Sequence, residues 1–197
     1  MGGALRRAEQ REQTRQALVR ESRRLFATVG YGAVGLSQIV AAAGVTKGAL
    51  YHHFDSKAAV FRAVLEQVQQ EVAEQVVAAA EAQSGSWARL TAGCRAFLTA
   101  STAPEVQRIM LVDGPAVLGW AEWRALDEAA SAHHLAEALA DLVADGTIAT
   151  QPVAPLAHLL SGAMNEAALW LATTTSPYAL EQTWAALARL LDGLRTA

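Results

Sequence analysis

Apolar positions recur at helical spacing along most of the chain. From 9 to 29 they fall on one face, and Gly30 ends the run as a C-terminal glycine does. A shorter segment from 37 to 43 repeats the pattern and stops at Gly44. Because strand-like alternation of apolar and polar residues is absent, the pattern predicts an all-α fold.

A third short helix is predicted after Thr46, whose hydroxyl suits the N-cap position. Val45, just before it, is placed to pack on Leu50 as a hydrophobic staple, which fixes the direction of the helix. Leu50 and Phe54 share its core face, so the other face is free. A fourth helix is expected to reach about residue 83 and to link two domains.

The rest of the chain continues the helical pattern. Further helices are predicted over 87–99, 105–112, 120–144, 153–173 and 178–194, with prolines between them or at their starts. The predicted organisation is an N-terminal three-helix domain at 1–58 and a larger C-terminal helical domain at 59–197.

Composition and charge divide the chain unevenly. With 197 residues and 52% hydrophobic content it can bury a substantial core, and its single cysteine, Cys94, excludes an internal disulfide. The first 62 residues hold ten Lys and Arg against four acids, a net charge of +6, whereas the remainder holds six against fifteen, a net charge of -9. A basic end suggests a polyanionic partner, and the alternative is a solvated helix face.

No apolar stretch is long and unbroken enough for a membrane span, since polar residues interrupt 156–171. The charged N-terminus has no apolar run behind it, so it does not resemble a signal peptide. We expect a cytoplasmic, nucleoid-associated protein with no membrane contact.

The two short helices and the tight turn at 43–45 are typical of a DNA-reading helix-turn-helix, with the motif at about 36–55. Gly48 would let the backbone approach duplex DNA closely. Lys47 and His52 would reach bases or phosphates, and the Tyr51 hydroxyl a phosphate.

The sequence also resembles a known family. The residues that carry the resemblance are Gly30-Tyr31, Ile39, Ala43 to Gly48, Leu50 to Phe54, and Lys57. They resemble the TetR family of bacterial transcriptional regulators over about the first quarter of the chain. The resemblance implies an all-helical homodimer whose C-terminal domain binds a small molecule and then releases operator DNA. It also implies that the operator is faced by Thr46, Lys47, Gly48, Tyr51, His52 and Lys57.

Lys57 lies in the first turn of the fourth helix, where its charge and the free amides would form an anion site for a phosphate. Gly35 stands where the family usually has a threonine or serine that caps the second helix and contacts a phosphate. We expect Ser37 to take over that role, so it joins the predicted DNA-binding residues.

The last two predicted helices carry apolar seams suited to a dimer interface. The seam residues are Leu156, Leu160, Ala163 and Ala167 on one helix, and Leu180, Trp184, Leu187 and Leu191 on the other. Two such helices from each subunit would form a four-helix interface. Burial of the same seams within one subunit is the alternative.

The aromatic residues of the C-terminal half predict an apolar ligand pocket. The residues expected to line it are Phe97, Met110, Trp120, Trp123 and Trp170, with Asn165 and Glu166 as polar groups that orient an unknown effector. These two polar residues could equally face a dimer axis or solvent. No cofactor and no metal are expected.

The predicted function is therefore a sequence-specific transcriptional repressor that binds double-stranded operator DNA and is not an enzyme. An activator on the same fold, and an architectural DNA-binding protein without an effector, are alternatives. A helical enzyme using His133, His134 or Glu166 lacks a recognisable nucleophile and base. His133 and His134 lie near Glu137 and Asp141 on a predicted helix, but no second cluster supports a metal there. A sensing role for these histidines or for Cys94 is left open.

Overall fold

The computed structural model describes the backbone of residues 2–196 and the side chains of residues 5–196. Its N-terminal elements are α1 (Gly2–Val29), the 3-10 turn η1 (Tyr31–Ala33), α2 (Leu36–Ala42), α3 (Lys47–His53) and α4 (Lys57–Glu81). The middle of the chain forms α5 (Ser86–Ser101), α6 (Pro104–Gln107), the π-helical η2 (Arg108–Asp113), α7 (Gly114–Leu118), α8 (Trp120–Asp127) and the π-helical η3 (Glu128–Ala132). The chain ends with α9 (His133–Ala144), α10 (Val153–Thr173) and α11 (Ala179–Asp192). The predicted all-α fold is confirmed, and between residues 2 and 196 β-pairing is limited to an isolated bridge from Ile148 to Arg195.

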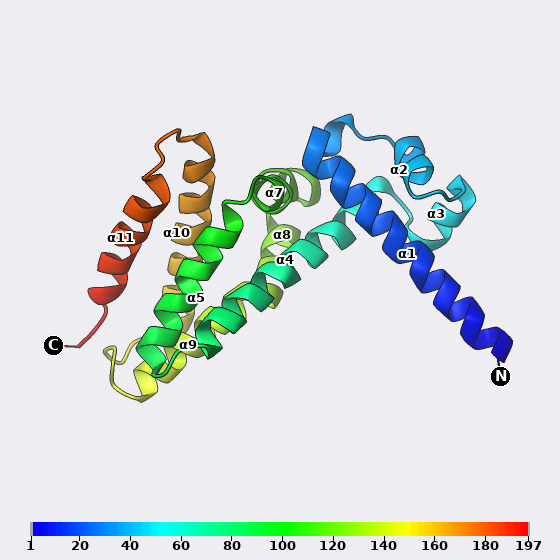
Figure 1. Cartoon of the computed structure of the whole chain (residues 1–197). Coiled ribbons are helices and arrows are strands. Elements are labelled where there is room, and N and C mark those ends of the chain that lie inside the picture. Colours follow the sequence, from blue (N-terminus) through cyan, green and yellow to red (C-terminus); the bar gives the residue numbers. More distant parts are fainter. Residues whose placement is uncertain (1, 197) are drawn as a thin grey trace.

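Figure 1 shows two groups of helices joined by α4. The first three helices gather at one end, whereas α5, α9, α10 and α11 form the other, and α4 runs between them. The first turns of α4 belong to the N-terminal core, since the Phe61 ring lies 5.4 Å from that of Phe26 and 5.2 Å from that of Tyr31. The predicted boundary between 58 and 59 falls inside the first turn of this shared helix and stays a prediction.

Three predicted helices have different limits in the structure. α1 begins at Gly2 rather than near residue 9, because its first turns are polar and carry no apolar period. The segment 120–144 is not one regular helix: η3 separates α8 from α9 with a π-helical turn. The helix predicted at 105–112 extends through α6, η2 and α7, with another π-helical turn in the middle. Apolar spacing does not distinguish a π-turn from an α-turn within a continuous helical run.

Polar contacts connect the two ends of the molecule. The Arg23 guanidinium of α1 donates to Glu71 of α4 at 2.6 Å and also to Glu105 of α6. The backbone amide of Tyr31 donates to the Asp113 carboxylate, which belongs to η2, at 3.0 Å. The N-terminal helices are therefore held by side chains of the C-terminal region as well as by α4.

None of the helices between residues 2 and 196 is long and apolar enough to cross a membrane.

Candidate functional site

The turn between α2 and α3 fixes the direction of α3. Gly44 adopts a left-handed conformation with φ of 65°, which favours glycine, and the Val45 amide donates to the Val40 carbonyl at 3.0 Å. The Thr46 hydroxyl then accepts a hydrogen bond from the Ala49 amide at 3.1 Å, as predicted for an N-cap. Leu50 is fully buried, so the opposite face of α3 points outward.

This outward face and the neighbouring helix start carry most of the predicted DNA-binding residues. Those that are exposed are Ser37, Thr46, Lys47, Gly48, Tyr51 and His52. Lys47 Nζ lies 5.9 Å from the centre of the Tyr51 ring, so the cation and the phenol form one surface. A side chain at Gly48 would meet only the Thr46 hydroxyl, at 3.9 Å, which leaves the backbone open to approach. We call these six residues the α3 face.

Lys57 is arranged differently from the α3 face. It is half-buried, and its ammonium donates to the carbonyls of Tyr31 at 3.0 Å and Val34 at 2.9 Å. Nζ also lies 4.0 Å from the centre of the Tyr31 ring, within the range of a cation–π contact. These internal contacts explain a lysine at this helix start without a phosphate, and sequence reasoning missed them. A contact between Lys57 and DNA stays a prediction.

The start of α2 corrects one expectation. Gly35 is the N-cap residue, and the Gln38 side chain accepts a hydrogen bond from its amide at 2.7 Å. Ser37 lies inside the first turn and caps nothing. The prediction that Ser37 replaces the missing capping side chain is therefore wrong, although its exposed hydroxyl still belongs to the α3 face.

A cavity of about 340 Å³ lies in the C-terminal region. Its walls come from α4, α5, η3, α9 and α10, with Asp127 at the end of α8. The apolar lining includes Leu90, Cys94, Phe97, Leu135 and Met164, and the polar and ionisable lining includes Glu81, Arg89, Asp127, His134, Glu137 and Asp141. Both its volume and its mixed lining are typical of a small-molecule site.

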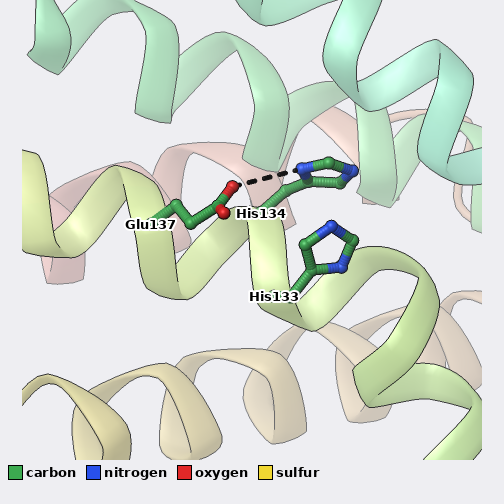
Figure 2. A group of neighbouring side chains, drawn as sticks. All are labelled: His133, His134 and Glu137. Atoms are coloured by element: carbon green, nitrogen blue, oxygen red, sulfur yellow. Dashed lines mark ion pairs between the residues drawn. The ribbon is translucent and has the colours of Figure 1, made fainter.

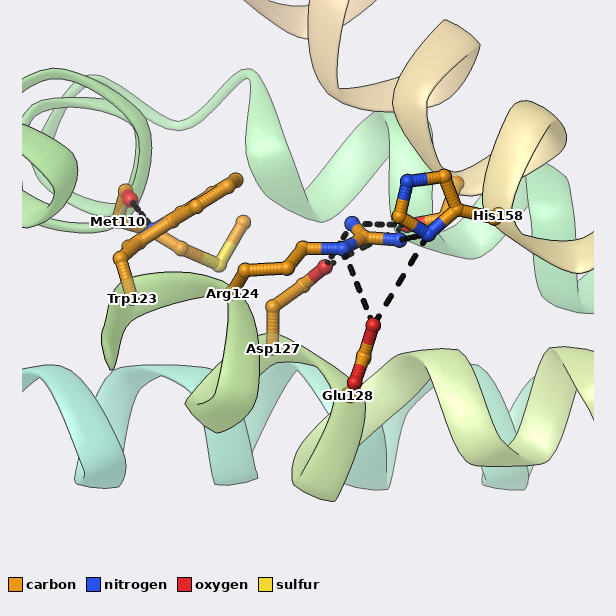
Figure 3. Close-up of polar contacts among 7 residues, drawn as sticks. Met110, Trp123, Arg124, Asp127, Glu128 and His158 are labelled. Carbon is orange, nitrogen blue, oxygen red and sulfur yellow. Dashed lines mark hydrogen bonds and ion pairs between the residues drawn. The ribbon is translucent and has the colours of Figure 1, made fainter. Parts of the chain in front are cut away.

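A buried polar cluster borders the cavity (Figure 3). The Arg124 guanidinium donates to the Asp127 carboxylate at 2.8 Å and to the Ser161 hydroxyl at 3.0 Å, and all three residues are less than 10% exposed. Asp127 and Ser161 line the cavity. Burial raises the pKa of Asp127, opposed by the charge of Arg124 and by hydrogen bonding from Ser161.

Asn165 lies beside this cluster and is 6% exposed. Its amide favours the ionised form of Asp127, yet neither of its polar atoms has a partner that meets ordinary hydrogen-bond geometry. We regard the interaction as a weak contact, since a well-aligned bond would satisfy the geometric limits. The site therefore holds an incompletely satisfied polar group next to a charged pair.

The cavity shares only Phe97 with the predicted pocket. Met110 and Trp123 are instead core residues, since the Trp123 indole donates to the Met110 carbonyl at 2.7 Å. Trp120 and Trp170 are 66% and 51% exposed. Apart from Phe97, the predicted pocket residues do not line this cavity; they are Met110, Trp120, Trp123, Asn165, Glu166 and Trp170.

Sequence reasoning missed the polar cluster that does border the cavity. A basic and an acidic residue three apart, Arg124 and Asp127, beside the apolar Trp123 were its sequence signal. Such a pair is more often a surface contact, and only tertiary packing buries it.

The residues predicted to form the dimer interface are also placed differently in the structure. Leu160, Leu187 and Leu191 are buried within the subunit itself, so the prediction that they face a partner is wrong, because these positions pack the C-terminal helices together. Leu156, Ala167, Leu180 and Trp184 are half-buried, and Ala163 is exposed. The other sides of α10 and α11 expose Leu159, Trp170 and Leu190, at 70%, 51% and 65%.

Cys94 lines the cavity but is only 4% exposed. Burial raises the pKa of its thiol to about 12. The thiolate, which is the reactive form, is therefore strongly disfavoured near neutral pH.

Residues 18–64 match the profile of bacterial regulatory proteins of the tetR family, and residues 87–194 match the Tetracyclin repressor-like C-terminal domain. The chain belongs to the TetR family. The first match covers α2, α3 and the turn between them, and the second covers most of the helices that form the cavity.

Solved structures share this fold over most of the chain. A regulator from Pectobacterium atrosepticum is 33% identical, with a TM-score of 0.81 over 96% of this chain and 97% of its own. RolR, solved in complex with resorcinol, is 17% identical, with a TM-score of 0.72 over 93% of this chain and 89% of its own. At 17% identity, the similarity to RolR shows a shared fold only.

Curated transcriptional regulators match this chain over part of its length. The transcriptional regulator AcrR of Shigella flexneri is 35% identical over 66 residues, and a repressor of Mycobacterium tuberculosis is 31% identical over 108 residues. These alignments cover 34% and 55% of this chain, and 31% and 57% of the relatives. The chain thus spans a third to about half of the length of the curated relatives.

Proposed function

We propose that this TetR-family protein represses transcription by binding duplex operator DNA with the α3 face, and that a small molecule in the cavity releases it. The observation that carries the proposal is the α3 face itself. It presents a cation, a phenol and an imidazole on a short helix whose other side is anchored by the buried Leu50. A helix of this kind fits the major groove, where such groups reach base edges and phosphates.

The charge of the N-terminal region supports a polyanionic partner. Its net charge of +6 over residues 1–62 contrasts with -9 over the rest. Basic residues supply most of the non-specific affinity for DNA, whereas the acidic C-terminal region would be repelled by phosphates. The protein would therefore approach the duplex with α1 to α3 leading.

A homodimer would present two α3 faces to successive major grooves of a palindromic site. We assign the contact to the exposed sides of α10 and α11, in place of the seams that are buried within the subunit. Leu159, Ala163 and Trp170 follow one side of α10, and Leu190 lies on α11. An isologous contact between two helices of each subunit would cover these apolar side chains.

The cavity supports the effector part of the proposal. An apolar body would pack on Leu90, Phe97 and Met164, while a polar group would reach Asp127 and Ser161. The contacts of Asp127 with Arg124 and Ser161 only partly offset the cost of burying its charge. A hydrogen bond donated by a ligand to this carboxylate would therefore contribute more binding free energy than the same hydrogen bond in water. RolR, which shares the fold, was solved with the small aromatic diol resorcinol.

The contacts between the two ends offer a route for release. Asp113 of η2 holds the Tyr31 amide, and Glu105 of α6 holds Arg23. A ligand that shifts η2 and α6 through the packed C-terminal helices would therefore move α1 to α3. Ligand and DNA would then oppose each other by the same free energy, typically about 1–3 kcal/mol.

The same geometry bears on the alternative of an enzyme. Within the described side chains, the buried acid that lines the cavity, Asp127, is engaged by Arg124, which suits recognition better than proton transfer. We therefore propose that the cavity binds a ligand without converting it.

The experiment that tests the proposal is selection of a randomised duplex library on the purified protein at near-physiological salt, with Tyr51→Ala as the parallel variant. Tyr51 is 47% exposed, so its removal should leave the fold intact, which circular dichroism would check. We expect an enriched palindrome that the variant fails to enrich. An equal pool from both proteins, or no enrichment by the folded wild type, would overturn the proposal.

A further inference from the structure

His133, His134 and Glu137 form a side-chain cluster at the start of α9 (Figure 2), and two of them, His134 and Glu137, line the cavity. The two imidazole rings lie side by side with their centres 3.7 Å apart. His134 Nδ1 is 3.6 Å from a carboxylate oxygen of Glu137, and one ligand atom from each residue lies within 4.8 Å of the others. The π-helical η3 ends immediately before His133.

We propose that this cluster binds a divalent transition-metal ion of the Zn²⁺ type. Imidazole nitrogen and carboxylate oxygen are the ligands that such ions take, at bond lengths of about 2.0–2.2 Å. Two ligands in a tetrahedral shell of that size are roughly 3.3–3.6 Å apart. The separation of 3.6 Å between His134 and Glu137 is already close to this value.

The remaining adjustment involves surface side chains. His133 is exposed and the Glu137 side chain is 73% exposed, so both can change rotamer without repacking the core. An ion pair between His134 and Glu137 accounts poorly for the arrangement, because exposed pairs contribute little stability. It also gives no role to His133, whose ring lies against that of His134 at a tilt of 40°.

Glu81 of α4 is the fourth ligand in this proposal, and its side chain would have to turn toward the ion, because its carboxylate does not lie within 4.8 Å of all three other ligand atoms. Glu81 and His134 together line the cavity and a second, adjoining depression between α4 and α9. Glu74 lines that depression too, but its carboxylate accepts a hydrogen bond from Gln70 at 3.2 Å. Among the described side chains, Glu81 has neither an ion pair nor a hydrogen bond, which leaves its carboxylate free for an ion.

The electrostatic surroundings favour a cation. Besides Glu137, the carboxylates of Glu81 and Asp141 line the cavity, whereas Arg89 is the cation that lines it. The ion would link α9 to α4, which runs from the N-terminal helices to the C-terminal group (Figure 1) and lines the cavity with its last turns. The proposal goes beyond the proposed function, since the metal would bind this cluster whether or not the protein binds DNA.

The test is isothermal titration of Zn²⁺ into the full chain, freed of tags and treated with a chelator, with Mg²⁺ as the comparison ion. We expect one Zn²⁺ per chain and no heat from Mg²⁺, which prefers oxygen ligands. Co²⁺ should give the visible absorption of a tetrahedral site. Binding of no Zn²⁺ by the wild-type chain would overturn the proposal.

Matched variants locate the site. The double variant His133→Gln/His134→Gln should lose binding by a factor of about 100 or more, given the contribution of two ligands. The control is His52→Gln/His53→Gln, which removes another pair of adjacent histidines whose ring centres are 6.3 Å apart, and it should bind Zn²⁺ like the wild type. Equal loss in the two double variants would contradict the site, with circular dichroism used to check that each is folded.

Glu81→Gln separates the ligand on α4 from those on α9. We expect its Zn²⁺ affinity to fall about tenfold or more, because the amide is a much weaker ligand than the carboxylate. Glu74→Gln, the neighbouring carboxylate on the same helix, serves as the control and should change the affinity little. Unchanged affinity in Glu81→Gln would remove α4 from the site.

Discussion

The α3 face and the C-terminal cavity differ in how their residues are brought together. The α3 face comes from one helix, its N-cap and the start of α2, so that local spacing decides what is exposed. The cavity takes its lining from helices far apart in the sequence, α4, α5, α9 and α10. The exposed residues of one short helix can therefore be predicted from sequence periodicity. The lining of a cavity cannot, because it depends on which helix faces pack against one another in the folded chain.

The largest expected effect is the loss of DNA affinity when residues of the α3 face are substituted. The double variant Lys47→Ala/Tyr51→Ala removes the exposed cation and the phenol beside it, each with an expected contribution of about 1–3 kcal/mol to DNA affinity. The affinity for the selected duplex should fall by a factor of about 100 or more, as measured by fluorescence anisotropy.

The control for this variant is Arg189→Ala, which removes an exposed cation from α11. It should bind the duplex like the wild type. A similar loss in both variants would mean that the affinity arises from general charge rather than from the α3 face.

The next largest effect is on stability, and it distinguishes the buried side of α11 from its exposed side. Leu187→Ala removes a side chain that is 6% exposed, so the free energy of unfolding should fall by about 2–5 kcal/mol. Leu190→Ala, at 65% exposure, should change the stability of the isolated subunit by less than about 0.5 kcal/mol.

Urea denaturation gives both stabilities, and sedimentation at several concentrations gives the oligomeric state. We expect Leu190→Glu to weaken the dimer while the subunit stays folded. A dimer of unchanged strength would show that α11 does not contribute its exposed side to the interface.

The sequence was sufficient for the helical class, the N-cap of α3 and the exposure of its outward residues. It was insufficient for predicting which helix packs against a given apolar side chain. Leu187 and Leu191 belong to an apolar stripe of the kind found at helical dimer interfaces, yet they are buried within the subunit. Periodicity alone does not show whether such a stripe packs on a helix of the same subunit or of a partner. Trp123 was predicted to line a pocket, but its indole reaches the Met110 carbonyl across a π-helical turn that no apolar pattern indicates.

A smaller effect tests the connection between the two regions. Asp113→Asn weakens the hydrogen bond to the Tyr31 amide, a loss of about 1 kcal/mol or less. We expect it to change the free-energy coupling between ligand and DNA by about 0.5–2 kcal/mol while leaving ligand affinity in the absence of DNA unchanged.

The measurement is the affinity of the protein for an identified effector with and without the selected duplex. Asp192→Asn, an exposed aspartate on α11, is the control. An unaltered coupling in Asp113→Asn would show that this junction does not transmit the change.

The smallest expected effect concerns pH and the N-terminal region. Burial, together with the positive charges of Arg11 and Arg15, lowers the pKa of His53 below its ordinary value of 6.5. The folded state then binds this proton less readily than the unfolded chain, so His53 contributes stability above pH 6.5 that is lost as the pH falls below it.

His53→Gln should therefore lose slightly less stability than the wild type between pH 7 and pH 5, by thermal denaturation. The exposed neighbour His52→Gln is the control. An equal or greater loss in His53→Gln would contradict the assignment.

The most direct test of the central claim, that the α3 face lies in the major groove, is site-specific cross-linking to the selected duplex. The background is Cys94→Ser, which replaces the buried thiol. A photoreactive group is attached to His52→Cys on α3 and, as the comparison, to Arg189→Cys on α11, both exposed positions. The account predicts cross-links to bases within each half-site from position 52 and none from position 189; cross-links from position 189 alone, or equal ones from both, would contradict it.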